Sequence, residues 1–116
     1  MLPEKKLKIL VIDDEPATLE LFIFGLKQNG YDVVTANNGK NGITKAVQEK
    51  PDLIFLDIIM PEMDGFTVCE DLKKDNQTKN IPVVLFTAKS GTIDVEKGFK
   101  IGAADCIIKP PKWMNY

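Results

Sequence analysis

Short runs of apolar residues alternate along this chain with longer segments in which apolar residues recur every three or four positions. Leu53–Leu56 and Pro82–Phe86 are not interrupted by polar residues, which indicates strands that are buried on both faces. All the short runs are too brief for helices and predict strands. They cover Lys8–Ile12, Tyr31–Ala36, Leu53–Leu56, Pro82–Phe86 and Asp105–Ile108. Strands that alternate with helices in this way favour a parallel sheet with helices on both faces.

The longer segments predict four helices between the strands. The first begins at Pro16, which suits the first turn of a helix, and ends at Asn29-Gly30. The second is centred on Ala46 and ends before Pro51, and the third is centred on Cys69 and followed by a polar loop over residues 73–80. The fourth runs from about Ile93 to Ile101, ahead of Gly102. Together these elements predict one doubly wound α/β domain over residues 1–116.

Composition and charge exclude several classes of protein. The 116 residues suit one domain, and 44% hydrophobic with 28% charged residues is ordinary for a globular chain. The net charge is −2 and the lysines form no basic stripe, so we expect no direct binding to nucleic acid. No apolar run reaches 18 residues and the N-terminus does not resemble a signal peptide, which favours a cytoplasmic protein with no membrane contact. Cys69 and Cys106 stand at apolar positions, so we expect buried thiols in a reducing compartment.

Polar residues that could bind a ligand or take part in a reaction follow the ends of the predicted strands. Asp13 and Asp14 follow the first strand, Asp57 the third, Thr87 the fourth and Lys109 the fifth. The carboxyl ends of parallel strands open onto one edge of the sheet, so these side chains should converge. Three carboxylates in one crevice raise one another's pKa unless a cation lies among them. The chain has no histidine, and oxygen ligands alone favour Mg²⁺.

This arrangement suits chemistry at phosphorus. Asp57 would act as a carboxylate nucleophile, with the metal, Lys109 and Thr87 holding the phosphoryl oxygens. Each residue taken singly has a simpler explanation. The acidic run could cap the following helix, Thr87 could be a loop hydroxyl, and Asp57 and Lys109 could be polar strand ends. Their occurrence together at the ends of four strands favours a site.

The residues that form these motifs resemble the response-regulator receiver domain of two-component signalling. The motifs are Asp13-Asp14-Glu15, the segment 57–65 (Asp-Ile-Ile-Met-Pro-Glu-Met-Asp-Gly), Thr87-Ala88 and Lys109-Pro110, and the resemblance runs from about Leu7 to Pro110. It implies a flavodoxin-like sheet in the order 2-1-3-4-5, with the first and a fifth helix on the same face.

The resemblance also implies a function. Asp57 would accept a phosphoryl group from a histidine of a partner kinase or phosphotransfer protein, and the domain would signal to a downstream effector. Asp13, Asp14, Asp57 and the backbone carbonyl of Ile59 would hold Mg²⁺, while Thr87 and Lys109 would contact the phosphate. Such a domain is not an enzyme in the usual sense, although it assists its own phosphorylation and dephosphorylation.

Two features depart from the family pattern. Cys106 stands three positions before Lys109, where the family usually has an aromatic residue, and Pro111 with residues 112–116 stands where a fifth helix would begin. These departures predict a missing or truncated C-terminal helix. The strands that it would cover are apolar on both faces, so we expect either that homo-oligomers form through the uncovered face or that the chain is a fragment of a longer protein.

Two other functions compete with a phosphoacceptor switch. A receiver-like scaffold that binds partners independently of phosphorylation is favoured by Cys106 and the short C-terminus, but not by the intact acidic motifs. A magnesium-dependent phosphatase with an aspartyl nucleophile would need a second aspartate two residues after Asp57 as a general acid, and Ile59 occupies that position. The phosphoacceptor switch is therefore the leading interpretation.

Overall fold

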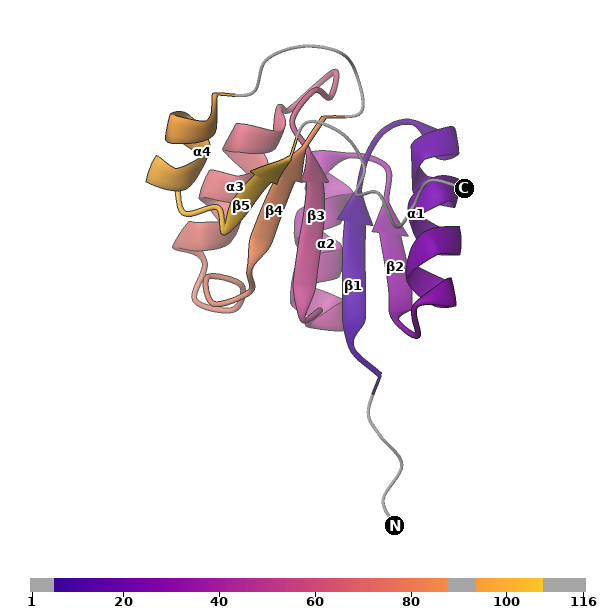
Figure 1. Cartoon of the computed structure of the whole chain (residues 1–116). Coiled ribbons are helices and arrows are strands. Elements are labelled where there is room, and N and C mark those ends of the chain that lie inside the picture. The colour runs from indigo at the N-terminus through magenta and orange to yellow at the C-terminus, as the bar shows by residue number, and fades with distance from the viewer. Residues whose placement is uncertain (1–5, 88–93, 108–116) are drawn as a thin grey trace.

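A computed structural model describes residues 6–87 and 94–107 of the chain (Figure 1). Its elements are β1 Lys8–Ile12, α1 Pro16–Gln28, β2 Asp32–Ala36, α2 Gly39–Glu49, β3 Leu53–Asp57, α3 Gly65–Lys74, β4 Val83–Phe86, α4 Val95–Lys100 and β5 Asp105–Ile107. The strands form one parallel sheet in the order β2-β1-β3-β4-β5. The predicted fold and strand order are confirmed.

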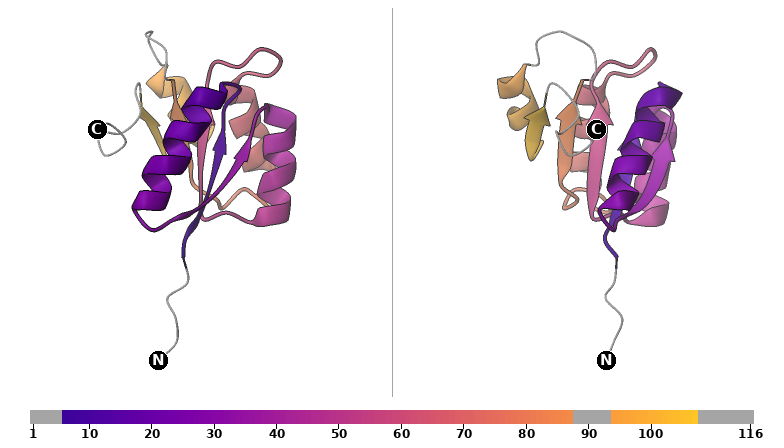
Figure 2. Two further views of the ribbon diagram at one scale, coloured as in Figure 1. Left: turned by 90° about the vertical axis from the view of Figure 1, so that its right-hand side faces the viewer. Right: turned by 45° about the vertical axis from the view of Figure 1, so that its right-hand side comes forward.

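The helices divide between the two faces of the sheet (Figures 1 and 2). Among the described helices, α1 covers one face, where Phe22 packs against Phe55 and Phe86 with ring centroids 5.1 and 4.9 Å apart. Helices α2 and α3 cover the other face, and Ala46 and Leu72 are fully buried there. This two-sided core places the C-terminal ends of all five strands on one edge, as doubly wound sheets do.

Helix α3 is longer than predicted, because Lys73 and Lys74 belong to it and not to the following loop. The Lys73 ammonium donates to the carbonyl oxygens of Ile81 at 2.6 Å and Lys79 at 3.2 Å. Positive charge in the last turn of a helix also stabilises it. The last turn of α3 is therefore stabilised by hydrogen bonds to Lys79 and Ile81, which lie beyond the end of the helix.

Other boundaries moved by one or two residues. Strands β2 and β4 begin one residue later than predicted, and Asn38 caps α2, so Gly39 is helical and not part of the preceding turn. The predicted start of the fourth helix at Ile93 lies outside the described residues. Gly102 has φ +102°, a conformation that favours glycine, and its role as terminator of α4 is confirmed.

The two cysteines differ in burial. Cys69 is fully buried on α3, and burial raises the pKa of its thiol to about 11. Cys106 on β5 is only half-buried, so the prediction of a buried thiol is wrong there. The strand lies at the edge of the sheet, which leaves one side of it with fewer neighbours.

Several predictions concern residues outside the described ranges. They include the phosphate-contacting role of Lys109, the missing fifth helix after Pro110, and the self-association inferred from that missing helix. These stay predictions. Within the described part of the chain, no helix has both the length and the apolar character needed to cross a bilayer.

Candidate functional site: an acidic cluster at the carboxyl edge of the sheet

Asp13 and Asp57 lie side by side because their strands are hydrogen-bonded neighbours. Ile12 pairs with Leu56 in the parallel register, and each aspartate is the next residue along its strand. Asp57 is 5% exposed and Asp13 is 1% exposed, so both carboxyl groups are largely removed from water. Burial of an acidic group in this way disfavours its charged form.

Backbone hydrogen bonds orient both side chains. Asp13 Oδ1 accepts from the backbone N–H of Glu15 at 2.8 Å, and Asp57 Oδ1 accepts from that of Ile59 at 3.2 Å. Glu15 occupies the N-cap position of α1 but makes no side-chain capping hydrogen bond. Capping of α1 by the Glu15 side chain therefore does not explain the acidic run.

Three carboxylates converge at this edge. One oxygen from each of Asp13, Asp14 and Asp57 lies within 4.8 Å of the others. Burial, followed by the nearby charges of Asp57 and Asp14, raises the pKa of Asp13 to about 7, although the hydrogen bond from Glu15 opposes this. Such crowding is unfavourable for the ionised groups unless a positive charge compensates it.

Asp14 also indicates that the acidic cluster is suited to bind a cation. Its Oδ1 atom is buried and finds no hydrogen-bond partner within the described part of the chain. A buried unsatisfied carboxylate oxygen costs free energy that a cation would recover. Because the cluster offers only hard oxygen donors, it fits Mg²⁺ better than a softer metal.

Thr87 and Ile59 lie close to this cluster. Thr87 follows Phe86, which pairs with Asp57, and its backbone N–H donates to Ile107 at 3.2 Å. Thr87 is buried, whereas the Ile59 side chain is 47% exposed. The structure thus brings Asp13, Asp14, Asp57, Ile59 and Thr87 to one edge, and Lys109 lies outside the described residues.

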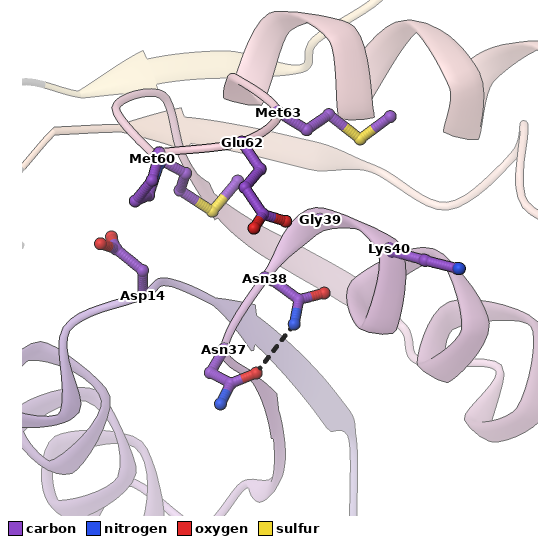
Figure 3. Close-up of a pocket in the computed structure, with 9 residues that line it drawn as sticks. Asp14, Asn37, Asn38, Gly39, Lys40, Met60, Glu62 and Met63 are labelled. Atoms are coloured by element: carbon purple, nitrogen blue, oxygen red, sulfur yellow. Dashed lines mark hydrogen bonds between the residues drawn. The ribbon is translucent and has the colours of Figure 1, made fainter.

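Sequence reasoning missed a cavity of about 420 Å³ beside the acidic cluster. Its lining comes from the β1–α1, β2–α2 and β3–α3 connections and the first turn of α2, and consists of Asp14, residues 37–40 and residues 60–63 (Figure 3). Asn38 Nδ2 donates to Asn37 Oδ1 at 3.1 Å, while Lys40 points away from Asp14 (Figure 3). In the sequence, the turn-forming residues 37–39 were the available signal of this cavity. Their approach to residues 60–63 depends on how the helices and strands pack, which the sequence pattern does not show.

Comparisons with known proteins identify the family. A family model described as the response regulator receiver domain matches residues 9–114. The chain therefore belongs to the response regulator receiver family, whose members are signalling domains of two-component systems. This finding agrees with the fold and with the acidic cluster.

Individual relatives support this assignment. The chain is 47% identical over 103 residues to the DNA-binding dual master transcriptional regulator RpaA of Synechocystis, covering 89% of this chain and 43% of RpaA. It is 43% identical over 110 residues to the alkaline phosphatase synthesis transcriptional regulatory protein PhoP of Bacillus subtilis, covering 93% of this chain and 45% of PhoP. The chain thus spans less than half the length of these relatives.

A solved structure shows the same architecture. Chemotaxis protein CheY4 of Vibrio cholerae superposes with a TM-score of 0.85 at 28% sequence identity. The match covers 94% of this chain and 91% of the CheY4 chain. The doubly wound, flavodoxin-like arrangement of five strands is therefore that of receiver domains.

Proposed function

We propose that this chain is a phosphorylation-dependent switch in which Asp57 accepts a phosphoryl group. The observation that carries the proposal is the convergence of three carboxylates, one oxygen of each within 4.8 Å of the others, at the carboxyl edge of the sheet. Asp57 is the member that ends the central strand, where ligands of open α/β sheets bind. Membership of the receiver family supports this assignment.

Asp13, Asp14 and Asp57 would hold Mg²⁺, together with the backbone carbonyl of Ile59. The unsatisfied Asp14 Oδ1 and the raised pKa of Asp13 both support a bound cation at this position. When bound, Mg²⁺ compensates the crowded carboxylates and the charge on the phosphoryl oxygens. The acyl phosphate would form on the chain's own carboxylate.

The transfer step is a displacement at phosphorus. A carboxylate oxygen of Asp57 forms a bond to phosphorus, and the bond from phosphorus to the donor breaks, its electron pair leaving with the donor atom. The chain contains no histidine, so the donor is the phosphohistidine of a kinase or phosphotransfer protein, or a small acyl phosphate. Thr87 and Lys109 would contact the phosphoryl oxygens and communicate their presence to a downstream effector.

We further propose that residues 1–116 act as a single receiver domain in the cytoplasm. The domain assists its own phosphorylation and dephosphorylation but has no separate substrate to turn over. RpaA is named as a DNA-binding regulator. For this chain the net charge of −2 supports signalling through proteins and not direct binding to nucleic acid.

The test is phosphorylation by acetyl phosphate with Mg²⁺, followed by intact-mass spectrometry. We expect one base-labile phosphoryl adduct on the wild-type protein and none on Asp57→Asn. Asp64→Asn is the matched control, because Asp64 is exposed and asparagine also caps helices well. Equal labelling of the wild type and Asp57→Asn would overturn the assignment. A folded wild type without any adduct would favour the phosphorylation-independent scaffold.

A further inference from the structure

Helix α3 begins in direct contact with the backbone of the phosphoacceptor. The N–H of Gly65, the first residue of α3, donates to the carbonyl of Ile58 at 2.8 Å. A Cβ atom added at Gly65 would clash with the Asp57 carbonyl oxygen and would lie 2.6 Å from Ile58 Cα. The absence of a side chain at Gly65 therefore allows the first turn of α3 to touch the Asp57–Ile58 peptide.

This contact differs in kind from those of Gly39 in α2 and Gly98 in α4, which are also buried. An added Cβ at Gly39 would meet Val68 Cγ2 at 2.6 Å, and one at Gly98 would meet Cys106 Sγ at 2.6 Å. Side-chain atoms of that kind can rotate aside, but the peptide backbone at Gly65 cannot. An added methyl group at Gly65 must therefore move either α3 or the peptide that carries Asp57.

The same peptide is held on its other side by the sheet. The N–H of Ile58 donates to the carbonyl of Phe86 at 2.9 Å, which continues the ladder between β3 and β4. One residue further on, the N–H of Ile59 donates to Asp57 Oδ1. A displacement of this backbone would therefore move both the Asp57 carboxylate and the carbonyl of Ile59.

We propose that Gly65 is a positioning residue: by fitting the first turn of α3 against the Asp57–Ile58 peptide, it sets the place of the Asp57 carboxylate relative to Asp13 and Asp14. The proposal rests on the phosphoacceptor function proposed above. Asp64 helps to hold the same helical turn, because its side chain caps α3 by accepting from Thr67 N–H at 2.9 Å. Loosening this cap should loosen the turn that holds the peptide.

The first test compares Gly65→Ala with Gly98→Ala, which adds the same methyl group against a side chain on α4. In metal-free protein, we expect the amide resonance of Ile59 to shift in Gly65→Ala and to stay in place in Gly98→Ala. Mg²⁺ affinity and the rate of phosphorylation by acetyl phosphate should each fall on the order of tenfold in Gly65→Ala, since small misplacements of reacting groups are costly. Both should change less than twofold in Gly98→Ala at an equal folded fraction.

A second pair of variants keeps the proposal testable if Gly65→Ala does not fold. Asp64→Ala removes the cap of α3, and Asp94→Ala removes the equivalent cap of α4, which accepts from Lys97 N–H at 3.0 Å. Both lose one exposed negative charge. We expect slower phosphorylation and weaker Mg²⁺ binding only in Asp64→Ala, with Asp64→Asn restoring both.

The outcomes separate this proposal from the function on which it rests. A folded Gly65→Ala with wild-type Ile59 resonance, Mg²⁺ affinity and rate would overturn the positioning role while Asp57 phosphorylation stands. Equal effects of Asp64→Ala and Asp94→Ala would do the same. If the wild type takes up no phosphoryl group, the proposed function fails. The Ile59 resonance and Mg²⁺ affinity then still decide whether Gly65 positions the carboxylates.

Discussion

Asp13 lies beside Asp57 at the ends of two paired strands, and the charge of Asp57 adds to burial in raising the pKa of the Asp13 carboxyl to about 7. The two groups therefore do not ionise independently. Asp13 is the deeper of the two, at 1% exposed. The metal-free pocket consequently has a free-energy cost at neutral pH, because buried carboxyl groups crowd one another there.

The stability of the metal-free protein should fall as the pH rises from about 4 to about 7. Asp13 has a pKa of 3.8 when unfolded and about 7 when folded, so in this window the folded state keeps a proton that the unfolded state has released. Rising pH then favours unfolding, by on the order of a few kcal/mol. Chemical denaturation in EDTA at pH 5 and 7.5 would measure this loss. It should shrink in Asp13→Asn and with added Mg²⁺, and an identical loss in the variant would contradict the prediction.

Replacement of Asp57 by Asn should stabilise the metal-free protein at neutral pH by about 1 kcal/mol, the scale of one pKa unit. The reason is that one of the three crowded charges is removed while the shape of the side chain is kept. Thermal melts without Mg²⁺ would test this, with Asp32→Asn as a control at an exposed position on β2. Added Mg²⁺ should raise the melting temperature of the wild type more than that of the variant. A clearly less stable Asp57→Asn would argue against charge crowding.

Dephosphorylation should be slow because of Ile59. Its side chain is 47% exposed beside Asp57, and it offers an attacking water molecule apolar bulk and no hydrogen bond. We expect Ile59→Asn to hydrolyse its phosphoryl group about fivefold faster, as one hydrogen bond of about 1 kcal/mol would predict. Loss of the adduct can be followed by mass spectrometry after the donor is removed. Leu7→Asn, at an exposed apolar position before β1, should hydrolyse at the wild-type rate. An unchanged rate in Ile59→Asn would disprove the idea.

We expect Lys50 to limit the stability of α2. It ends this helix with φ 48° and ψ 58°, a left-handed conformation that is unfavourable for a residue with a Cβ atom. Lys50→Gly should therefore raise the free energy of unfolding by about 0.5–1 kcal/mol, whereas Lys45→Gly inside the helix should lower it by about 1 kcal/mol. Urea denaturation would measure both changes. Destabilisation by Lys50→Gly would show that the lysine side chain makes a compensating contact.

We expect the chain to self-associate through the part of the α1 face of the sheet that α1 itself leaves uncovered. Leu53, Val84 and Ile107 are only partly buried on that face. Burial of apolar area contributes about 25 cal/mol per Å², so even a few hundred Å² would favour association. Sedimentation velocity over a range of concentrations should show an increasing sedimentation coefficient. A monomer at every concentration, with no binding of a hydrophobic dye, would rule this out.

The helices and strands and their order along the chain follow from the amino-acid sequence alone. The apolar periodicity of each segment reports the faces that the segment will bury, and this information is local. The residues that follow the strands are equally plain in the sequence, and because parallel strands share one edge, Asp13, Asp14 and Asp57 are expected to lie together.

The packing of the folded chain settles which atoms are crowded, buried or in contact. It made Asp13 the carboxyl with the pKa raised to about 7, left Asp14 Oδ1 without a partner in the described chain, and placed Gly65 against the Asp57 peptide. It also extended α3 through the hydrogen bonds of Lys73 and opened the cavity between residues 37–40 and 60–63. These features depend on distances between segments remote in sequence, and such distances follow from how the whole core packs.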